Sequence, residues 1–266
     1  MGLKFRMFFI VLAYLTAVSI CALPSQEVGS AVAARDTSSI GNLVLREVVV
    51  GLDHPWAVAP LPGGALLITE RPGRLWHLTA EPARELQRVS GVPDLYARGQ
   101  GGLLDVIISE TFSRDNTVYI SYSAGKRVGA VTAVARAQLN VRSNGVELEN
   151  VQQIFELNRV VSGGRHFGSR LALGPDGNLY ITVGERGQSE QAQDPTNHQG
   201  SVVRINPDGS IPSDNPRQIV DPRGGVLQPA PGLYSWGHRN AQGMARHPET
   251  GEIWLHEHGP RGGDEI

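Results

Sequence analysis

The segment Leu61–Glu70, with the sequence LPGGALLITE, recurs in altered form as GPDGNLYIT at Gly174–Thr182 and as HPETGEIWL at His247–Leu255. A looser copy, RDNTVYISY, occupies Arg114–Tyr122. Each copy begins with turn-forming residues and continues into an apolar or alternating run typical of an inner strand. The proline anchors of the three closer copies lie 113 and 73 residues apart, about the spacing of propeller blades that carry insertions.

From Leu43 onward, short β-branched or aromatic runs alternate with Gly, Pro, Asn and Asp, and no stretch keeps a helical period. The sequence therefore predicts an all-β fold. A β-sandwich also has turns at short intervals, but a phrase repeated over such long separations favours a β-propeller, whose loops at one end of a channel bind ligands. About four blades are visible before Ile266, where another strand begins. Because a propeller cannot close with open edges, we expect a fragment that lacks later blades.

The composition excludes several classes of protein. The chain has 266 residues, of which 40 % are hydrophobic, 19 % are charged, 32 are Gly and 17 are Pro. This balance is turn-rich but globular, and it excludes collagen, a coiled coil and wholesale disorder. The formal net charge of −2 argues against a protein that binds nucleic acid or a membrane surface.

The first residues have the layout of a targeting signal. Residues 1–22 combine a short basic region with an apolar run, which predicts a secretory signal peptide and hence a periplasmic or secreted protein. Lipid attachment through Cys21 is the less favoured alternative, because Ile20 is bulkier than the small residue expected before such a cysteine. Residues 23–41 are rich in Ser, Ala and Gln and are expected to form a linker. Residues 42–266 are expected to form the partial propeller.

Polar side chains concentrate in four glycine-rich phrases. The sequence has no dinucleotide-binding glycine motif after a strand, no P-loop, no H-E-x-x-H and no C-x-x-C, so the common nucleotide, zinc and redox-thiol sites have no support. In the four phrases, glycines allow the backbone to approach a ligand closely. They are RGQGGLLD at 98–105, GGRHFGSRL at 163–171, GHRNAQG at 237–243 and EHGPRGGDE at 257–265.

Five residues are candidates for a catalytic or binding role. Four lie in the glycine-rich phrases, and the fifth follows the next predicted strand. A neutral His166 suits a general base near neutral pH, and Glu185, after the next predicted strand, could fix its tautomer. Arg239 could stabilise developing negative charge on an oxygen, while Gln100 and Asn240 offer neutral hydrogen bonds. Each residue also has an ordinary structural interpretation. His166 could be a hydrogen-bonded loop histidine, Glu185 a solvated carboxylate and Arg239 part of a surface ion pair. Gln100 and Asn240 could each form only the hydrogen bonds of a turn.

Taken together, the four phrases resemble the soluble quinoprotein sugar dehydrogenases, the glucose and aldose sugar dehydrogenase family that uses pyrroloquinoline quinone and calcium. The resemblance runs from about Leu52 to the end of the chain. It rests on the ordered set of phrases, since any one alone would be weak. The family implies a six-bladed propeller with the quinone over its channel, and oxidation of an aldose to a lactone. It also implies an electron acceptor, a quinone or a cytochrome, and a homodimer is possible.

The resemblance implies a role for each candidate side chain. His166 would take the proton of the anomeric hydroxyl while hydride moves to the quinone, and Glu185 would orient that histidine. Gln100 would bind the substrate oxygen beside the cofactor. Arg239 would stabilise the quinone oxygen as it becomes anionic, and Asn240 would bind the cofactor.

The same resemblance implies a calcium site at the last phrase. Gly259 and Pro260 would offer backbone carbonyls to the ion, a type of ligand that calcium accepts, and Asp264 would support them. The sequence departs from the family at Arg165, where the glucose-oxidising branch has an aspartate, which predicts a broader aldose specificity. It also departs at Ala241, which replaces a proline. The cofactor ligands expected beyond Ile266 are missing, so a chain that ended there would be inactive.

Two functions from other classes remain as alternatives. A calcium-dependent propeller hydrolase of the lactonase type would need carboxylate and Asn ligands that point inward. A non-catalytic propeller that binds a carbohydrate or a protein would need no cofactor. Binding of the quinone would separate both alternatives from the dehydrogenase.

Overall fold

The computed structural model describes residues 36–40, 43–221 and 223–266. Within them the chain consists of strands and loops, with one short helix, α1 (Phe112–Asp115), and one 3₁₀ turn, η1 (Ser189–Gln193). In this part of the chain, no helix has the length and apolar character needed to cross a membrane. The prediction of an all-β fold is confirmed. The predicted signal peptide, including Cys21, lies outside the described residues.

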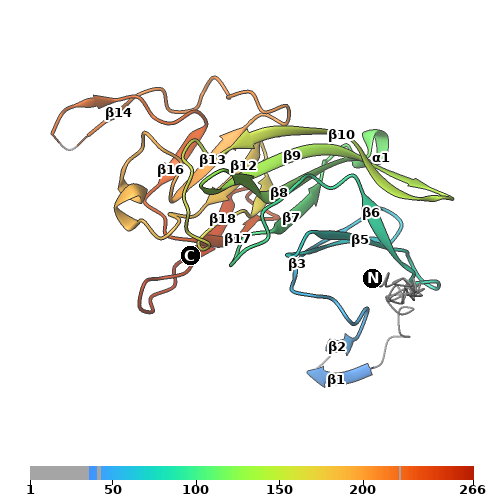
Figure 1. Cartoon of the computed structure of the whole chain (residues 1–266). Coiled ribbons are helices and arrows are strands. Elements are labelled where there is room, and N and C mark those ends of the chain that lie inside the picture. The colour runs from blue at the N-terminus through green and yellow to red at the C-terminus, as the bar shows by residue number, and fades with distance from the viewer. Residues whose placement is uncertain (1–35, 41–42, 222) are drawn as a thin grey trace, which may run out of the picture.

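The first two units are four-stranded antiparallel meanders (Figure 1). Their strands in chain order are β3 (Pro55–Pro60), β4 (Leu66–Glu70), β5 (Arg74–Leu78), β6 (Leu86–Ser90), β7 (Leu103–Ile108), β8 (Thr117–Lys126), β9 (Gly129–Arg142) and β10 (Gly145–Glu156). The outermost strands of the two meanders pair in parallel, with Val146 of β10 opposite Val89 of β6. The two units therefore share one eight-stranded sheet, in the order β3-β4-β5-β6-β10-β9-β8-β7.

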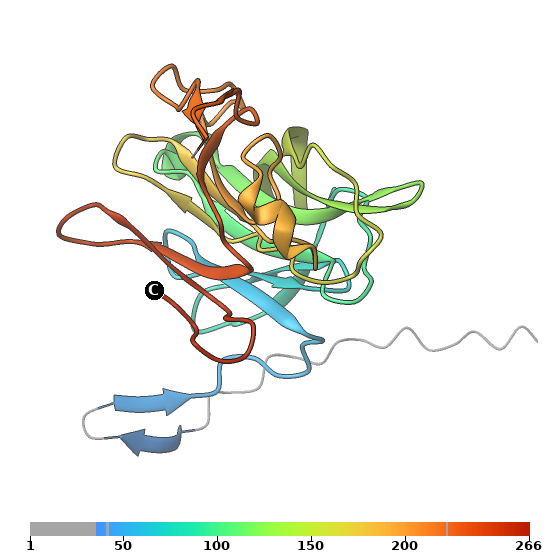
Figure 2. The same cartoon turned by 90° about the vertical axis from the view of Figure 1, so that its left-hand side faces the viewer.

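Two further units follow, one of four strands and one of two strands within the described residues (Figure 2). Their strands are β11 (Leu171–Leu173), β12 (Leu179–Val183), β13 (Ser201–Ile205) and β16 (Leu233–Trp236), then β17 (Ala241–Arg246) and β18 (Ile253–Glu257). The first strands of successive units are neighbours, since β7 contacts β3 and β11, and β11 contacts β17. Consecutive meanders with adjoining first strands are the architecture of a β-propeller, as predicted.

Two small hairpins lie apart from these units. One joins β14 (Ile219–Val220) to β15 (Val226–Leu227), and the other joins β1 (Asp36–Ile40) to β2 (Leu43–Arg46). In Figure 1 the β1–β2 hairpin lies below the body of the molecule. Strand β1 falls inside the segment 23–41 that was predicted to be a linker. Residues 36–40 of that segment form a strand that pairs with β2, and the role of the segment as a linker stays a prediction.

The recurrent turn phrase has the same position in every unit. Each copy lies between the first and second strands and leads into the second strand, which is β4, β8, β12 or β18. In the third unit, Asp176 accepts a hydrogen bond from the main-chain N–H of Asn178 (3.1 Å), and Gly177 adopts a φ of +75°. A side chain with a Cβ rarely adopts that φ, so the turn explains the glycine. The predicted turn-to-strand unit is confirmed.

The second strands of the first three units also form the centre of the core. All five residues of β12 are buried, as are the first eight residues of β8 and the last four of β4. Both faces of these strands are covered because each sheet is packed between neighbouring units. This burial on both faces explains why the sequences of these strands are almost continuously apolar.

A hydroxyl on three of the second strands links its unit to the next unit. Thr69 Oγ1 donates to a main-chain carbonyl of β7 (2.5 Å), Ser121 Oγ to a carbonyl just before β11 (2.6 Å), and Thr182 Oγ1 to a carbonyl of β17 (2.8 Å). Each hydroxyl also accepts an N–H from the first-strand region of its own unit. All three side chains are fully buried, so their partners are protein groups.

Candidate active site

The four glycine-rich phrases meet in the structure. The N–H of Gln100 donates to the carbonyl of Gly164 (2.7 Å), which joins the first phrase to the second. The N–H of Gly168 donates to Asn240 Oδ1 (3.1 Å), which joins the second phrase to the third. The third and fourth phrases adjoin where the N–H of His258 donates to the Asn240 carbonyl (3.5 Å). Segments far apart in sequence thus form one loop cluster.

His166 and Glu185 form a hydrogen-bonded pair in this cluster. The His166 Nδ1 atom lies 2.9 Å from Glu185 Oε2, and the two side chains are 12 % and 5 % exposed. The main-chain N–H of His166 donates to Gln100 Oε1 (2.7 Å), so the predicted substrate-binding amide is in direct contact with the histidine. His166 has a φ of +54°, and this left-handed conformation at a non-glycine residue is maintained by its surroundings. The predicted contact between His166 and Glu185 is present.

The carboxylate of Glu185 is fixed from several sides. It accepts the N–H of Gly187 as well as the contact with the histidine. Its main-chain N–H donates to the carbonyl of Arg239 (2.9 Å), and its own carbonyl accepts from Gln199 Nε2 (2.9 Å). A carboxylate held in this way keeps a histidine ring in one orientation and favours the tautomer with hydrogen on Nδ1.

Gly184 lets the histidine approach the third unit closely. A Cβ at Gly184 would lie 2.1 Å from the main-chain oxygen of His166 and 3.0 Å from Asn240 Oδ1. Asn240 itself is 2 % exposed, and its amide holds the N–H of Gly168 and the side chain of Gln242 (3.2 Å). In this structure Asn240 therefore supports the loops, and its contact with a cofactor stays a prediction.

Arg239 lies at the junction of the third and fourth phrases. Its Nη1 donates to the carbonyl of His258 (3.0 Å), and its main-chain N–H donates to the carboxylate of Glu257. Glu257 also accepts from His238 Nδ1 (3.3 Å). Glu257 lies at the start of the fourth glycine-rich phrase, and the sequence predicted no role for it. Its contacts show that it positions the segment that carries Arg239.

The segment predicted to bind calcium is a tight, exposed turn. The N–H of Gly259 donates to Asp264 Oδ1 (2.8 Å), and a Cβ at Gly259 would lie 2.3 Å from the carbonyl oxygen of Gly262. A glycine-rich turn with crowded carbonyls beside a carboxylate provides the oxygen ligands that suit calcium. The residues fit the ion in their chemistry, and the assignment of Gly259, Pro260 and Asp264 stays a prediction.

Arg186 is a buried cation that sequence reasoning did not identify. It is 2 % exposed, and its guanidinium carbon lies 3.4 Å from the centroid of the Phe167 ring. It donates to the carbonyls of Gly163 (2.6 Å) and Arg165. Burial lowers the pKa of Arg186 to about 10. Its position directly after Glu185 was the available signal, but the sequence does not reveal that it holds the loop before His166.

A second ion pair, close to the first strands, joins the buried Asp105 to the half-buried Arg170. Arg170 Nη1 lies 3.1 Å from Asp105 Oδ1, its Nε donates to the carbonyl of Gln242 (2.9 Å), and its guanidinium lies 4.4 Å from the Trp56 ring centroid. Asp105 also accepts the N–H of Leu171 (2.8 Å). Desolvation raises the pKa of Asp105 to about 6, although Arg170 and the N–H donors act in the opposite direction.

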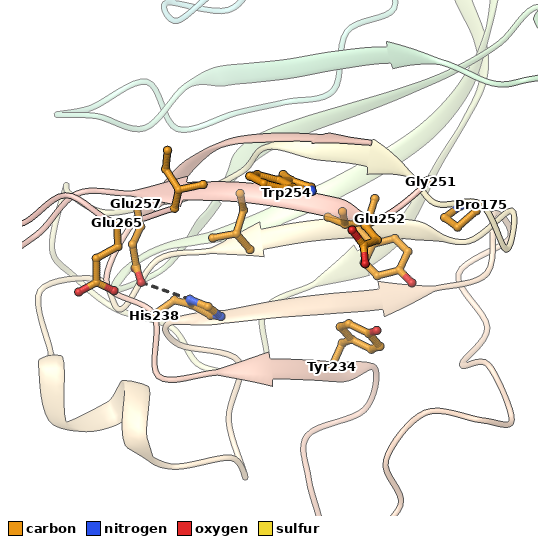
Figure 3. Close-up of a pocket in the computed structure, with 12 residues that line it drawn as sticks. Pro175, Tyr234, His238, Gly251, Glu252, Trp254, Glu257 and Glu265 are labelled. Carbon is orange, nitrogen blue, oxygen red and sulfur yellow. Dashed lines mark hydrogen bonds and ion pairs between the residues drawn. The ribbon is translucent and has the colours of Figure 1, made fainter. Parts of the chain in front are cut away.

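A cavity of about 750 Å³ lies beside the loop cluster (Figure 3). Tyr234 and Trp254 lie on its walls, and the hydrogen-bonded His238 and Glu257 lie at one end. His166 is not among the residues that line it. The cavity therefore adjoins the candidate site through Glu257, but we place the candidate site at the His166–Glu185 pair because the reactive groups converge there.

Known proteins share sequence with most of this chain. Residues 52–266 match the family model described as Glucose / Sorbosone dehydrogenase. The chain is 42 % identical over 217 residues to aldose sugar dehydrogenase YliI of Escherichia coli (strain K12), covering 81 % of this chain and 56 % of the relative. It is 30 % identical to quinoprotein glucose dehydrogenase B of Acinetobacter calcoaceticus, covering 85 % of this chain and 50 % of the relative.

A solved structure, the PQQ-bound form of aldose sugar dehydrogenase from Streptomyces coelicolor, superposes with a TM-score of 0.66 at 30 % identity. The match covers 81 % of this chain and 59 % of that chain. This chain thus spans between half and two thirds of the length of these relatives. With the family model covering most of the sequence, the chain belongs to the glucose / sorbosone dehydrogenase family.

Proposed function

We propose that the protein oxidises aldose sugars to lactones, with pyrroloquinoline quinone and calcium as cofactors and His166 as the general base. The observation that carries the proposal is the His166–Glu185 pair, with the Gln100 amide on the histidine's own main-chain N–H. The cofactor named in the Streptomyces coelicolor structure supports the choice of quinone. When bound, the quinone would accept the hydride, and calcium would polarise its carbonyl.

In this proposal His166 acts through Nε2. With Nδ1 bound to Glu185, the tautomer that carries its hydrogen on Nδ1 leaves the Nε2 lone pair available for the anomeric hydroxyl proton. The O–H bond breaks, the proton moves to Nε2, and C1 loses its hydrogen with two electrons as the C1–O bond becomes a carbonyl. Glu185 then stabilises the positive charge on the imidazolium.

Two other side chains would bind and orient the reactants. The Gln100 Nε2 group remains a donor for a sugar oxygen, since Oε1 is occupied by the N–H of His166. The Arg239 guanidinium would bind the quinone and favour negative charge on its oxygen. The carbonyls of Gly259 and Pro260, with Asp264, would hold the calcium ion. Because Glu257 holds the main chain of Arg239, it would fix the distance between this cation and the base.

Three further proposals concern the setting of the reaction. The protein would be exported, its reduced cofactor would pass electrons to a quinone or a cytochrome, and two copies could form a homodimer. Sequencing the N-terminus of the protein purified from the periplasm tests export, and sedimentation velocity tests the oligomeric state.

The test is a titration of the full chain with pyrroloquinoline quinone and calcium chloride, followed by absorbance before and after an aldose is added. Binding of the quinone and its reduction by the sugar are expected. His166→Gln should lower kcat by about 10²- to 10⁴-fold while the quinone stays bound, because the variant removes the base. His54→Gln, at a histidine whose side chain is 64 % exposed, is the matched control. No quinone binding in excess calcium would refute the proposal, and calcium-dependent lactone hydrolysis would support the hydrolase instead.

A further inference from the structure

Two arginines lie beside the loops that bring Gln100 and His166 together. Arg98 precedes Gln100 by two residues, and Arg165 directly precedes His166. The two loops adjoin through the Gln100 N–H bond to the Gly164 carbonyl (2.7 Å). A Cβ at Gly164 would lie only 3.6 Å from the carbonyl oxygen of Arg98. Both arginines therefore extend from the backbone that holds the histidine.

Arg165 is placed against the peptide that supports the base. A Cβ at Gly187 would lie 2.6 Å from Arg165 Nε and 3.0 Å from its Nη2, so the guanidinium covers the glycine. The N–H of that glycine donates to the Glu185 carboxylate that holds His166. The main chain of Arg165 is held in turn, because its carbonyl accepts from the Arg186 guanidinium. The exposed guanidinium of Arg165 therefore lies beside the peptide whose N–H holds Glu185.

Neither arginine has an acidic partner among residues 36–40, 43–221 and 223–266. Arg98 Nη1 contacts the hydroxyl of Tyr96 (3.4 Å), and no salt bridge of either arginine occurs in this part of the chain. The nearby carboxylate of Glu185 is already engaged by the histidine and by Gly187. Arg186 adds a buried positive charge beneath the same loop. This side of the site therefore has an excess of positive charge that a bound anion would neutralise.

We propose that Arg98 and Arg165 bind an anionic group on the sugar, so that the preferred substrates are aldoses with a carboxylate or a phosphate. This rests on the proposed sugar oxidation and narrows its substrate class. Guanidinium groups bind carboxylate and phosphate oxygens through paired charge-assisted hydrogen bonds, and a neutral sugar would leave them unused. The anomeric end of the sugar would lie at His166 and its anionic group at the arginines.

The test measures sugar binding directly, by isothermal titration calorimetry of the full chain with glucuronate, glucose 6-phosphate and glucose. The titrations are made with and without pyrroloquinoline quinone and calcium. We expect the two anionic sugars to bind about tenfold or more tightly than glucose, and this preference to weaken as sodium chloride is raised. A difference between glucuronate and the phosphate would identify the preferred anion.

The arginine variants separate this subsite from a general charge effect. Arg165→Gln and Arg98→Gln should each reduce the anionic preference severalfold or more, and Arg165→Lys should restore part of it. Arg114→Gln, which removes an exposed arginine of α1, is the matched control and should change nothing.

Three results would overturn the subsite. They are equal affinity for the charged and neutral sugars, an unchanged preference in Arg165→Gln, and weaker quinone binding in that variant with an unchanged sugar preference. The last would assign the arginines to the carboxylates of the cofactor. Failure of sugar oxidation alongside an arginine-dependent preference in the binding assay would refute the proposed function and leave the anion subsite standing.

Discussion

Replacing Asp105 by asparagine should change how the stability of the protein depends on pH. Asp105 is 2 % exposed and lies between the second and third units, where it accepts from Arg170 and from two main-chain N–H groups. Desolvation is the largest influence on its carboxyl and raises the pKa to about 6, compared with 3.8 for an exposed aspartate. The folded state therefore keeps the Asp105 proton at pH values where the unfolded chain has already released it.

The sign and size of the effect follow from that difference. Between pH 3.8 and about 6 the folded state binds more protons than the unfolded state, so stability falls as pH rises through this window. The two pKa values differ by about 2 units, and each unit corresponds to 1.36 kcal/mol, which gives about 3 kcal/mol. Relative to the Asp105→Asn variant, the natural protein should therefore lose about 3 kcal/mol of unfolding free energy between pH 3 and pH 7.

The assay is urea unfolding followed by tryptophan fluorescence at several pH values for both proteins. Taking the difference between them cancels the other titrating groups, and it also cancels the constant cost of removing an acceptor from Arg170. Asp94→Asn, at an exposed carboxylate, is the control. A difference that stays constant with pH, or that grows in favour of the natural protein as pH rises, would refute the argument that desolvation dominates at Asp105.

Three further changes test the packing of the units. Thr182→Val removes a hydroxyl that links two units, and it should cost about 1–3 kcal/mol of unfolding free energy because the main-chain carbonyl of Ala241 loses its donor. Gly184→Ala should displace the loop that carries His166 and abolish the proposed sugar oxidation, because its Cβ would meet a main-chain oxygen at 2.1 Å. Gly177→Ala, with no atom within 4 Å, should cost only the strain of its positive φ. Partial burial raises the pKa of Asp176, but its hydrogen bonds outweigh burial and lower it to about 2. About 2 kcal/mol of stability at most should therefore be lost as pH falls from about 4 to 2, and circular dichroism of Asp176→Asn would show whether that loss disappears.

Much of the fold could be predicted because the repeated phrase specifies a turn and a strand through its own residues. Pro with Gly or Asp sets a turn, and the apolar or alternating run that follows suits a strand, so β4, β8, β12 and β18 could be predicted from the sequence. The parallel pairing of β6 with β10 could not be predicted, because it joins residues more than fifty positions apart and no local sequence pattern indicates it. The strand at Asp36–Ile40 was missed because its composition resembles a linker and its partner strand decides its structure.

The site was predictable where side-chain chemistry is distinctive. His166, Glu185 and Gln100 were named from their residue types, and the structure brings all three together. The supporting residues Glu257 and Arg186 were not identified, because their roles depend on main-chain groups that only folding brings near. The sequence therefore revealed the candidate chemical groups, whereas the groups that hold them in place required the structure.

The contacts of Arg170 have a consequence for cooperativity. If each unit were joined only to its neighbours, the molecule would resemble a linear array in which one unit could open while distant ones stayed closed. Arg170, at the start of the third unit, contacts Trp56 in the first, Asp105 in the second and the Gln242 carbonyl in the fourth. This one side chain couples units that are not consecutive. The slowest-exchanging amides of all four should therefore be released in a single opening event, rather than one unit at a time.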